Sequence, residues 1–232
     1  MSSPRPELLV APCSYQAAKY AVEKWHYSGN IPPGKLVKLG VWEGGEFIGA
    51  VVFSHGANRN IGVPYGIKMM EAAELIRVAL SNHNTTVSRI VSHSIKALAK
   101  HAPGLRLLVS YADPREGHVG GIYQAMNWVY VGKTEASTAI IINGKEWHKK
   151  AAWASFGTNK VEQLGGHYIT TEGKHKYLYP LDRAMRKQIA PLAQPYPKRD
   201  TRPVNGDTLA TSEVGRFNSV PGALIEAEPH GD

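Results

Sequence analysis

The first 134 residues divide into segments whose apolar positions follow either the period of a strand or that of a helix. Alternating or continuous apolar runs, which indicate strands, lie at residues 7–12, on both sides of Gly44-Gly45 within 36–56, and at 73–80, 105–111 and 128–134. Apolar positions recur every three to four residues, as in amphipathic helices, over residues 14–28, 87–104 and 121–127. Ser14 can cap the first helix, and the paired glycines suit a hairpin turn with positive φ.

These elements predict the order strand, helix, three strands, helix, strand, helix, strand. Strands that alternate with helices in this way are typical of α/β proteins, in which helices flank a central sheet. We therefore predict a mixed α/β (α+β) domain with a central mixed sheet over residues 1–135.

Beyond this domain the pattern predicts two further hairpins and a last helix. The hairpins cover residues 138–150, with a turn at Asn143-Gly144, and 167–181, with a turn near Glu172-Gly173, and the helix covers 181–190. We predict that residues 136–190 form a basic extension packed on the domain.

Residues 191–232 differ in composition from the rest of the chain. They contain six of the 15 prolines, little periodic apolarity, four basic residues and six acidic ones. Such a segment cannot bury enough apolar surface to offset the entropy of ordering, so we expect a disordered tail. The whole chain carries a formal charge of +8 and the tail carries −2, so the first 190 residues carry +10. A positive folded part favours polyanionic partners, first nucleic acid and then an anionic cofactor.

The single cysteine, Cys13, excludes an internal disulfide and a cysteine-based zinc cluster. The sequence shows no signal peptide and no apolar run of membrane-spanning length. We therefore expect a soluble, cytoplasmic protein without a membrane partner, and the patterns leave its oligomeric state open.

The segment that ends the predicted domain resembles the end of the GNAT acyltransferase fold. A strand that stops at Asp113 precedes a short helix and a strand that read IYQAMNWVYVGKT, and the last helix and strand of that family have this kind of sequence. Tyr123 falls where the family commonly has an active-site tyrosine. The resemblance covers residues 7–135 and implies a GNAT-like fold.

Three blocks in order resemble a narrower family, the phage Mom proteins: residues 23–58, 74–80 and 111–134. This resemblance implies a phage enzyme of the host cytoplasm that adds a carbamoylmethyl (acetamido) group to the exocyclic amine of adenine in double-stranded DNA. The modification would protect the phage DNA from host restriction. Two other functions remain open: a conventional GNAT N-acetyltransferase of a small amine or protein, and a non-catalytic DNA-binding protein on the same fold.

The sequence leaves the group donor open. Typical GNAT proteins have a glycine-rich pyrophosphate loop after the central strand, but here the loop reads SNHNTTVSR, without glycine. Amides at a helix N-terminus still bind phosphate, so Ser88 and Arg89 are candidates for donor binding. Arg77 is a third candidate, because a charge inside an apolar strand needs an anionic partner; a structural ion pair with Glu71 or Glu74 is the alternative. Acetyl-coenzyme A, a glycine-derived donor and a metal-assisted route are all compatible with the sequence.

Four residues are candidates for catalysis. Asp113 ends a strand, where a carboxylate can act as general base toward an amine, although Asp-Pro also starts turns. Tyr123 could protonate a leaving group or orient the donor, or it could be a core aromatic. His26 and Tyr27 leave the first helix at a Gly- and Pro-rich loop, which suits proton transfer or base stacking. The helix dipole alone also favours a histidine there.

Candidates for a metal site are His26, His55, Asp113 and His118. No short ligand spacing connects them, so the sequence signal is weak. An amine is not easily alkylated by an ordinary thioester, so we include an iron-type facial site of converging histidines and a carboxylate among the hypotheses.

Basic and aromatic residues are interleaved late in the folded part. Residues 145–190 contain nine basic residues and four acidic ones. Cations bind phosphates and rings stack on bases, so this segment is our candidate for DNA contact; a solvated face beside core aromatics is the alternative. The DNA-contact candidates are Lys145, Lys149, Lys150, Lys174 and Lys176. An enzyme that modifies adenine in a duplex must also flip the base out of the stack.

Overall fold

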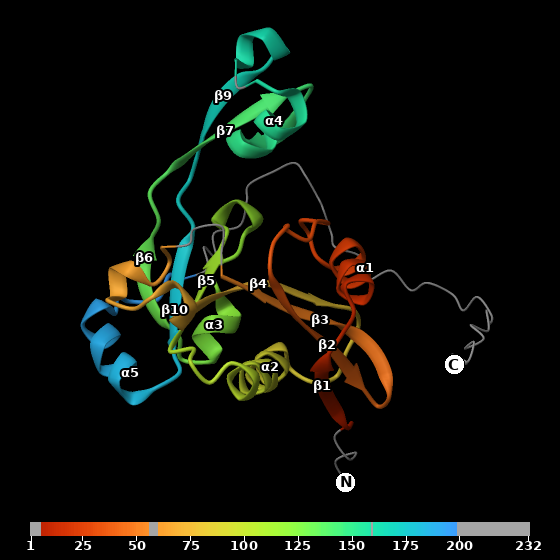
Figure 1. The fold of residues 1–232 in the computed structure, drawn as a ribbon, viewed down its shortest axis with the longest axis vertical. Helices are drawn as coiled ribbons and strands as arrows, with labels where there is room; N and C mark the ends of the chain where they lie inside the picture. The colour runs from red at the N-terminus through yellow and green to blue at the C-terminus, as the bar shows by residue number, and fades with distance from the viewer. Residues whose placement is uncertain (1–5, 56–59, 159, 199–232) are drawn as a thin grey trace, which may run out of the picture. The chain divides into compact units, whose positions relative to one another are not determined.

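The computed structural model describes residues 6–55, 60–158 and 160–198, all within residues 1–199, which form one of two compact units of the chain. Its main feature is a seven-stranded sheet with the order β1-β2-β3-β4-β5-β10-β6 (Figure 1). The chain between β6 and β10 forms a three-stranded sheet with the order β8-β7-β9. The mixed α/β fold expected from the sequence, with a central sheet flanked by helices, is confirmed.

The large sheet contains β1 (Leu8–Pro12), β2 (Leu36–Glu43), β3 (Glu46–Ser54), β4 (Ala72–Leu80), β5 (Leu107–Ala112), β6 (Val129–Lys133) and β10 (His175–Pro180). The small sheet contains β7 (Ser137–Ile142), β8 (Lys145–His148) and β9 (His167–Thr171). The helices are α1 (Tyr15–Trp25), α2 (Val87–His101), α3 (Gly121–Ala125), α4 (Lys149–Phe156) and α5 (Arg183–Ile189). Single 3-10 turns are η1 (Val63–Tyr65), η2 (Met69–Glu71), η3 (Pro114–Glu116), η4 (Val161–Leu164) and η5 (Ala190–Leu192).

Local sequence signals set the first half of the fold. Ser14 caps α1, and its side chain accepts a hydrogen bond from the Ala17 backbone N–H at 3.1 Å. Gly44 and Gly45 form the turn between β2 and β3 with φ of 59° and 87°. Both predictions are confirmed, and so is the order of strands and helices through β6.

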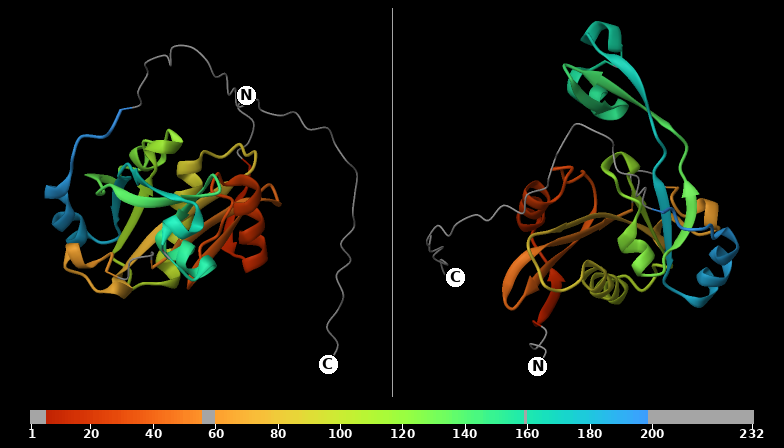
Figure 2. Two further views of the ribbon diagram at one scale, coloured as in Figure 1. Left: turned by 90° about the horizontal axis from the view of Figure 1, so that it is seen from above. Right: turned by 180° about the vertical axis from the view of Figure 1, so that it is seen from behind.

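Helices cover both faces of the large sheet (Figure 2). Along β3, Val51 and Phe53 face the core that contains α2, whereas Ala50 and Val52 face α1, as the alternation of a strand requires. α5 closes a further core through the buried side chain of Met185. The sheet is therefore the middle of three layers.

β4 and β5 run parallel, but they pair over a short stretch only. The paired positions run from Ala72 with Leu107 to Glu74 with Val109, and both strands continue beyond it. The C-terminal parts of the two strands therefore diverge, while β10 pairs with β5 on its other side. The opening lies at the carboxyl ends of parallel strands, where α/β sheets commonly present functional residues.

The second predicted hairpin, over residues 167–181, is wrong. β9 pairs with β7 in the small sheet, and β10 pairs with β5 and β6 in the large sheet. Tyr177 and Leu178 of β10 are fully buried there. The hydrophobic effect therefore outweighs the local turn signal near Glu172-Gly173 in deciding which strand β10 pairs with. The domain boundary expected at residue 135 falls between β6 and β7. β10 lies beyond this boundary in the sequence, although it belongs to the large sheet.

The first predicted hairpin is confirmed, as is the last helix, α5. The turn residues Asn143 and Gly144 join β7 to β8 with φ of 50° and 73°, the positive values that a two-residue hairpin turn needs. α4 follows β8 directly, and the hydrophobic pattern did not predict it.

The predicted start of the disordered tail, residue 191, lies too early in the sequence. The Gln194 backbone N–H donates to the Tyr130 carbonyl at 2.8 Å, and the Tyr196 hydroxyl donates to the Trp128 carbonyl at 2.8 Å. Residues 191–198 are thus ordered against β6 and its preceding turn, and the rest of the expected tail, 199–232, lies outside the described residues. None of the helices in the described part is long and apolar enough to cross a membrane.

We predict that Gly173→Ala destabilises the folded unit. Gly173 connects β9 to β10, and a Cβ there would overlap the Thr134 carbonyl oxygen. Overpacking against a fixed backbone atom typically costs about 1–3 kcal/mol, which chemical denaturation would measure. Gly104→Ala is the matched control, because a Cβ at Gly104 meets no atom within 4 Å. Equal stability of the two variants would show that the crossing at Gly173 is not tightly packed.

Candidate functional site

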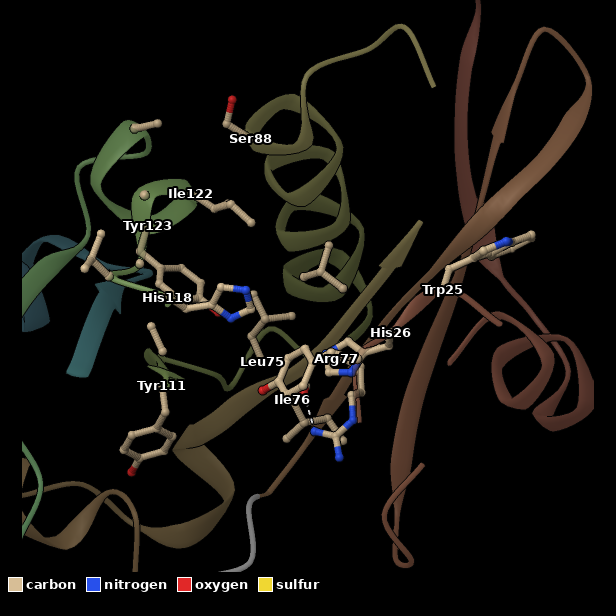
Figure 3. A pocket seen from close by; sticks show the side chains of 17 residues that line it. Trp25, His26, Leu75, Ile76, Arg77, Ser88, Tyr111, His118, Ile122 and Tyr123 are labelled. Atoms are coloured by element: carbon tan, nitrogen blue, oxygen red, sulfur yellow. Dashed lines mark hydrogen bonds between the residues drawn. The ribbon is translucent and has the colours of Figure 1, made fainter. Parts of the chain in front are cut away.

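A cavity of about 740 Å³ opens where β4 and β5 diverge (Figure 3). Its walls come from His26 and Tyr27 after α1, residues 75–78 of β4, residues 111–112 of β5, and the segment 118–123 that leads into α3. Figure 3 shows side chains from these separate elements turned toward one common space. The size is within the range of small-molecule and cofactor sites.

The cavity gathers most of the residues that the sequence singled out. The predicted site residues that line it are His26, Tyr27, Arg77, Ser88, His118 and Tyr123. Asp113 and Arg89 do not line it. His55 lines a second cavity, of about 400 Å³, between the ends of β3 and α2.

Three rings form one wall at the mouth of the cavity. The His26 and Tyr27 rings stack with centroids 4.4 Å apart, and the Tyr27 and His118 rings meet edge to face at 5.3 Å. Tyr27 is 58% exposed, so one part of its ring remains open to a ligand. An exposed aromatic beside a cavity suits stacking of a planar base.

The hydrogen bonds of His26 fix its tautomer. Its Nδ1 accepts the Ser28 backbone N–H at 3.1 Å and lies 2.9 Å from the Ser28 hydroxyl. A backbone N–H can only donate, so Nδ1 carries no proton and the neutral ring has its proton on Nε2. Burial lowers the pKa of His26 to about 4, with further contributions from the charges of Arg77 and His118. His26 is therefore a neutral hydrogen-bond donor at physiological pH, not a base.

Arg77 brings a positive charge to the cavity. Its Nε donates to the Asn30 carbonyl at 3.0 Å and its Nη1 to the Ile76 carbonyl at 2.7 Å. Burial lowers the pKa of the guanidinium, while Tyr27 and Glu74 act in the opposite direction. Within the described residues no carboxylate forms an ion pair with Arg77, so its charge is available to an anionic ligand.

Tyr123 is anchored by a residue that the sequence did not reveal. Ser110 Oγ lies 2.7 Å from the Tyr123 hydroxyl and 2.8 Å from the Leu75 carbonyl oxygen. A carbonyl can only accept, so the single Ser110 proton goes to Leu75 and Tyr123 donates to Ser110. Burial raises the pKa of Tyr123 to about 12, so the hydroxyl is protonated at physiological pH. Ser110 is a polar residue at a buried position of a strand, and that was the only signal in the sequence.

Asp113 does not line the cavity, and its carboxylate is ion-paired instead. The carboxylate is 4% exposed and lies 3.0 Å from Lys174 Nζ and 3.5 Å from Arg115 Nε. It also caps η3 by accepting the Arg115 backbone N–H at 3.1 Å. Burial alone would raise the pKa of Asp113, but the bonds from Lys174 and Arg115 hold it below its ordinary value. This geometry favours a positioning role over the predicted role as a general base.

The predicted metal ligands do not come together. His26 and His118 line the cavity, Asp113 is ion-paired outside it, and the Nδ1 of His55 lies 3.3 Å from the Ala72 carbonyl oxygen. In the described parts of the chain, no three His, Cys, Asp or Glu side chains could hold a metal ion together. These residues therefore do not fit the expected iron-type facial site.

The expected phosphate loop before α2 holds an internal anion. The carboxylate of Glu43 accepts the backbone N–H groups of Asn84 and Thr85, both at 2.8 Å. Ser88 lines the cavity, and its hydroxyl is 3.4 Å from that of Thr86. Two of the amides that the GNAT resemblance assigns to a coenzyme A pyrophosphate, those of Asn84 and Thr85, are thus already bonded to Glu43.

The predicted DNA-contact lysines lie on several elements. The Lys145 ammonium is 4.8 Å from the centre of the Trp147 ring, and the Lys176 ammonium is 5.1 Å from that of Tyr65. Lys174 is held by Asp113. Lys149 and Lys150 begin α4, and their side chains lie outside the described residues.

Comparison with known proteins gives one family match. Residues 7–198 match the model of the Mom protein family. The methylcarbamoylase mom of Escherichia phage Mu is 26% identical over 210 residues, which cover 83% of this chain and 84% of the phage protein.

Several solved structures match this chain at low sequence identity. The N-acyl amino acid synthase FeeM from uncultured soil microbes has a TM-score of 0.46 at 11% identity, covering 79% of this chain and 94% of its own. The spermidine/spermine N-acetyltransferase SpeG from Vibrio cholerae has 0.43 at 8%, covering 78% and 96%. A GNAT family acetyltransferase from Elizabethkingia anophelis, with acetyl-CoA bound, has 0.39 at 12%, covering 75% and 98%.

We predict that His26 is neutral at pH 7, carries its proton on Nε2, and titrates near pH 4. Two-bond ¹H–¹⁵N NMR spectra of protein labelled at histidine would show the tautomer, with His26→Gln identifying the signal. His101 is the internal control, because its Nδ1 lies 2.8 Å from the Ala97 carbonyl and must carry the proton in the neutral ring.

The pH dependence has a defined sign. The pKa of His26 is lower in the folded state than its ordinary value of 6.5, so the unfolded state binds more protons between pH 6.5 and about 4. Stability from this group therefore decreases as the pH falls through that window. A His26 signal with the Nδ1 proton, or a midpoint near 6.5, would contradict the assigned geometry.

Proposed function

The chain belongs to the Mom protein family, and from this membership we propose that it adds a carbamoylmethyl group to the exocyclic amine of adenine in phage DNA. The observation that carries the proposal is the extent of the family match. It runs over residues 7–198 and so includes every element that lines the cavity. The similarity to a protein named methylcarbamoylase supports the nature of the transferred group.

The cavity has the chemistry that a flipped adenine nucleotide needs. A base that leaves the duplex must be stacked and hydrogen-bonded in a closed pocket. Tyr27 offers an exposed ring for stacking, and His26 offers its Nε2–H as a donor. Arg77 offers an unpaired positive charge, within the described residues, to a phosphate or to an anionic part of the donor.

The reaction is a displacement at the methylene carbon of an activated carbamoylmethyl donor. The adenine nitrogen forms a bond to this carbon while the bond from the carbon to the leaving group breaks, and the leaving group takes the electron pair. The Tyr123 hydroxyl is protonated at physiological pH, and we propose that its proton, which is bonded to Ser110 in the free protein, is donated to the leaving group when the donor is bound. The amine loses a proton to water, and the Tyr123 phenolate takes up a proton from the solvent, which restores its hydroxyl.

Asp113 takes part through the segment that it orders. It holds η3 and Lys174, and so it fixes the chain just before His118 and α3. We therefore assign Asp113 as a positioning residue and Tyr123, His26 and Tyr27 as the groups that contact substrate.

We predict that Tyr123→Phe abolishes adenine modification while the protein stays folded. The change removes one hydroxyl and keeps the ring that packs on Trp128, with centroids 5.0 Å apart. General acid catalysis contributes typically about 10²–10⁴-fold to rate, so modified adenine should become undetectable. Mass spectrometry of nucleosides from DNA of expressing cells gives the readout.

The matched control is Tyr20→Phe, which removes the hydroxyl of an exposed tyrosine on α1. It should leave modification at the level of the unchanged protein. Carbamoylmethyl-adenine at that same level in the Tyr123→Phe cells would refute the assigned role. An acetylated amine as the product of the unchanged protein would favour a conventional acetyltransferase.

We also predict that the affinity for duplex DNA decreases steeply with salt, in part through Lys145, Lys149 and Lys150. Each phosphate that is neutralised releases condensed counterion, so replacing three contacting lysines by Gln should make the log–log slope shallower by up to about three. Base preference should change little, because phosphate contacts position the protein without reading sequence.

The control replaces three exposed lysines on other elements, Lys24, Lys96 and Lys100, by Gln. It removes the same charge from α1 and α2 and should leave the slope nearly unchanged. Equal slopes for the unchanged protein and the first variant would show that these lysines only solvate the surface.

A further inference from the structure

We propose that Glu43 closes the anion-binding loop before α2, so that the donor of the reaction is not held as a coenzyme A thioester through its pyrophosphate. The amides of this loop are the place where the GNAT resemblance locates the pyrophosphate, and an internal carboxylate occupies two of them, those of Asn84 and Thr85. The inference deepens the proposed function by narrowing the donor class, and it rests on that function only for the identity of the reaction.

The contact between Glu43 and the loop is built from the backbone. Glu43 is the last residue of β2 and is 9% exposed. It accepts three hydrogen bonds: the Asn84 N–H at 2.8 Å, the Asn84 side-chain amide at 3.3 Å, and the Thr85 N–H at 2.8 Å. The two carboxylate oxygens therefore bind the loop amides in a bidentate way, as two oxygens of a phosphate would.

The neighbouring strands of the large sheet fix the backbone of Glu43. Glu43 pairs with Leu8 of β1 on one side and Glu46 of β3 on the other. The next residue, Gly44, donates its N–H to the Glu7 carbonyl at 2.9 Å. A side chain fixed between two strands and buried under the loop cannot swing away at small cost.

The charge of Glu43 persists at the pH where the enzyme works. The backbone N–H of Asn84, followed by the other bonds from Thr85, lowers the pKa of Glu43, and burial opposes this only in part. The stabilisation from this group is present above its ordinary pKa and is lost as the pH falls through the lowered value. A dianionic pyrophosphate beside this carboxylate would meet like-charge repulsion and two amides that are already bonded.

The loop also differs from GNAT-type loops in its residues. GNAT-type loops use glycines there, whereas this one presents Thr85, which is buried, and Thr86, which starts α2. Ser88 is the residue of the first helical turn that reaches the cavity. On this proposal the donor has no nucleoside pyrophosphate and fits within the cavity of about 740 Å³ beside Arg77.

The experiment measures binding of coenzyme A and of inorganic pyrophosphate to the full-length chain by calorimetry. The unchanged protein should show no saturable binding of either compound up to about millimolar concentration. Glu43→Gln keeps the side-chain shape and removes the charge, and it should gain measurable pyrophosphate binding. Glu46→Gln removes an exposed carboxylate at the other end of the same turn and should gain none.

Two results would overturn the proposal. One is saturable binding of coenzyme A to the unchanged protein, which remains measurable even if Glu43→Gln fails to fold. The other is a folded Glu43→Gln protein that binds pyrophosphate no better than Glu46→Gln does.

Nucleoside analysis separates this inference from the proposed function. A protein that binds coenzyme A and carbamoylmethylates adenine would overturn only the inference. A protein that binds no coenzyme A and leaves adenine unmodified would overturn only the proposed function.

Discussion

The short parallel pairing of β4 with β5 determines where this protein can place its chemistry. Pairing ends at Glu74 and Val109, and from there the backbone groups of the two strands need other partners. Ser110 supplies one by donating its hydroxyl proton to the Leu75 carbonyl at 2.8 Å, and the same oxygen receives the Tyr123 hydroxyl. The Ser110 hydroxyl thus both bonds the Leu75 carbonyl where the sheet opens and orients the proposed acid, Tyr123.

The electrostatics of the cavity follow from this opening. The groups that face it include the neutral His26, the protonated Tyr123 and Arg77, and no carboxylate is among the described residues that line it. Such a site stabilises negative charge and donates hydrogen bonds, but it does not offer a strong base. It therefore suits a reaction in which charge develops on a leaving group, with a weakly nucleophilic amine that loses its proton to solvent.

The sequence predicted what depends on neighbours along the chain and missed what depends on distant ones. The Ser14 cap, the Gly44-Gly45 turn and the element order through β6 follow from local signals. The exchange of partners by β9 and β10 was missed, because a turn signal records a change of direction and not the strand that will pair. Ser110 and Glu43 were missed for the same reason, since each acquires its role from a contact more than 30 residues away. His26 and Arg77 were found because their types are unusual at their places in their own segments, and Tyr123 was found through the GNAT resemblance.

The position of Asp113 shows how a carboxylate outside a cavity can still control it. By capping η3 it sets the direction of a segment that turns at Gly117 and Gly120, with φ of 67° and 75°. At Gly120 a Cβ would overlap the Tyr177 ring, whose hydroxyl donates to the Val119 carbonyl. The segment is therefore held at both ends, and it delivers the His118 ring to the edge of Tyr27. Loss of the Asp113 charge would free Lys174 and leave Arg115 paired with Glu146 alone, so its effect on the cavity would come through chain position and not through a lost proton acceptor.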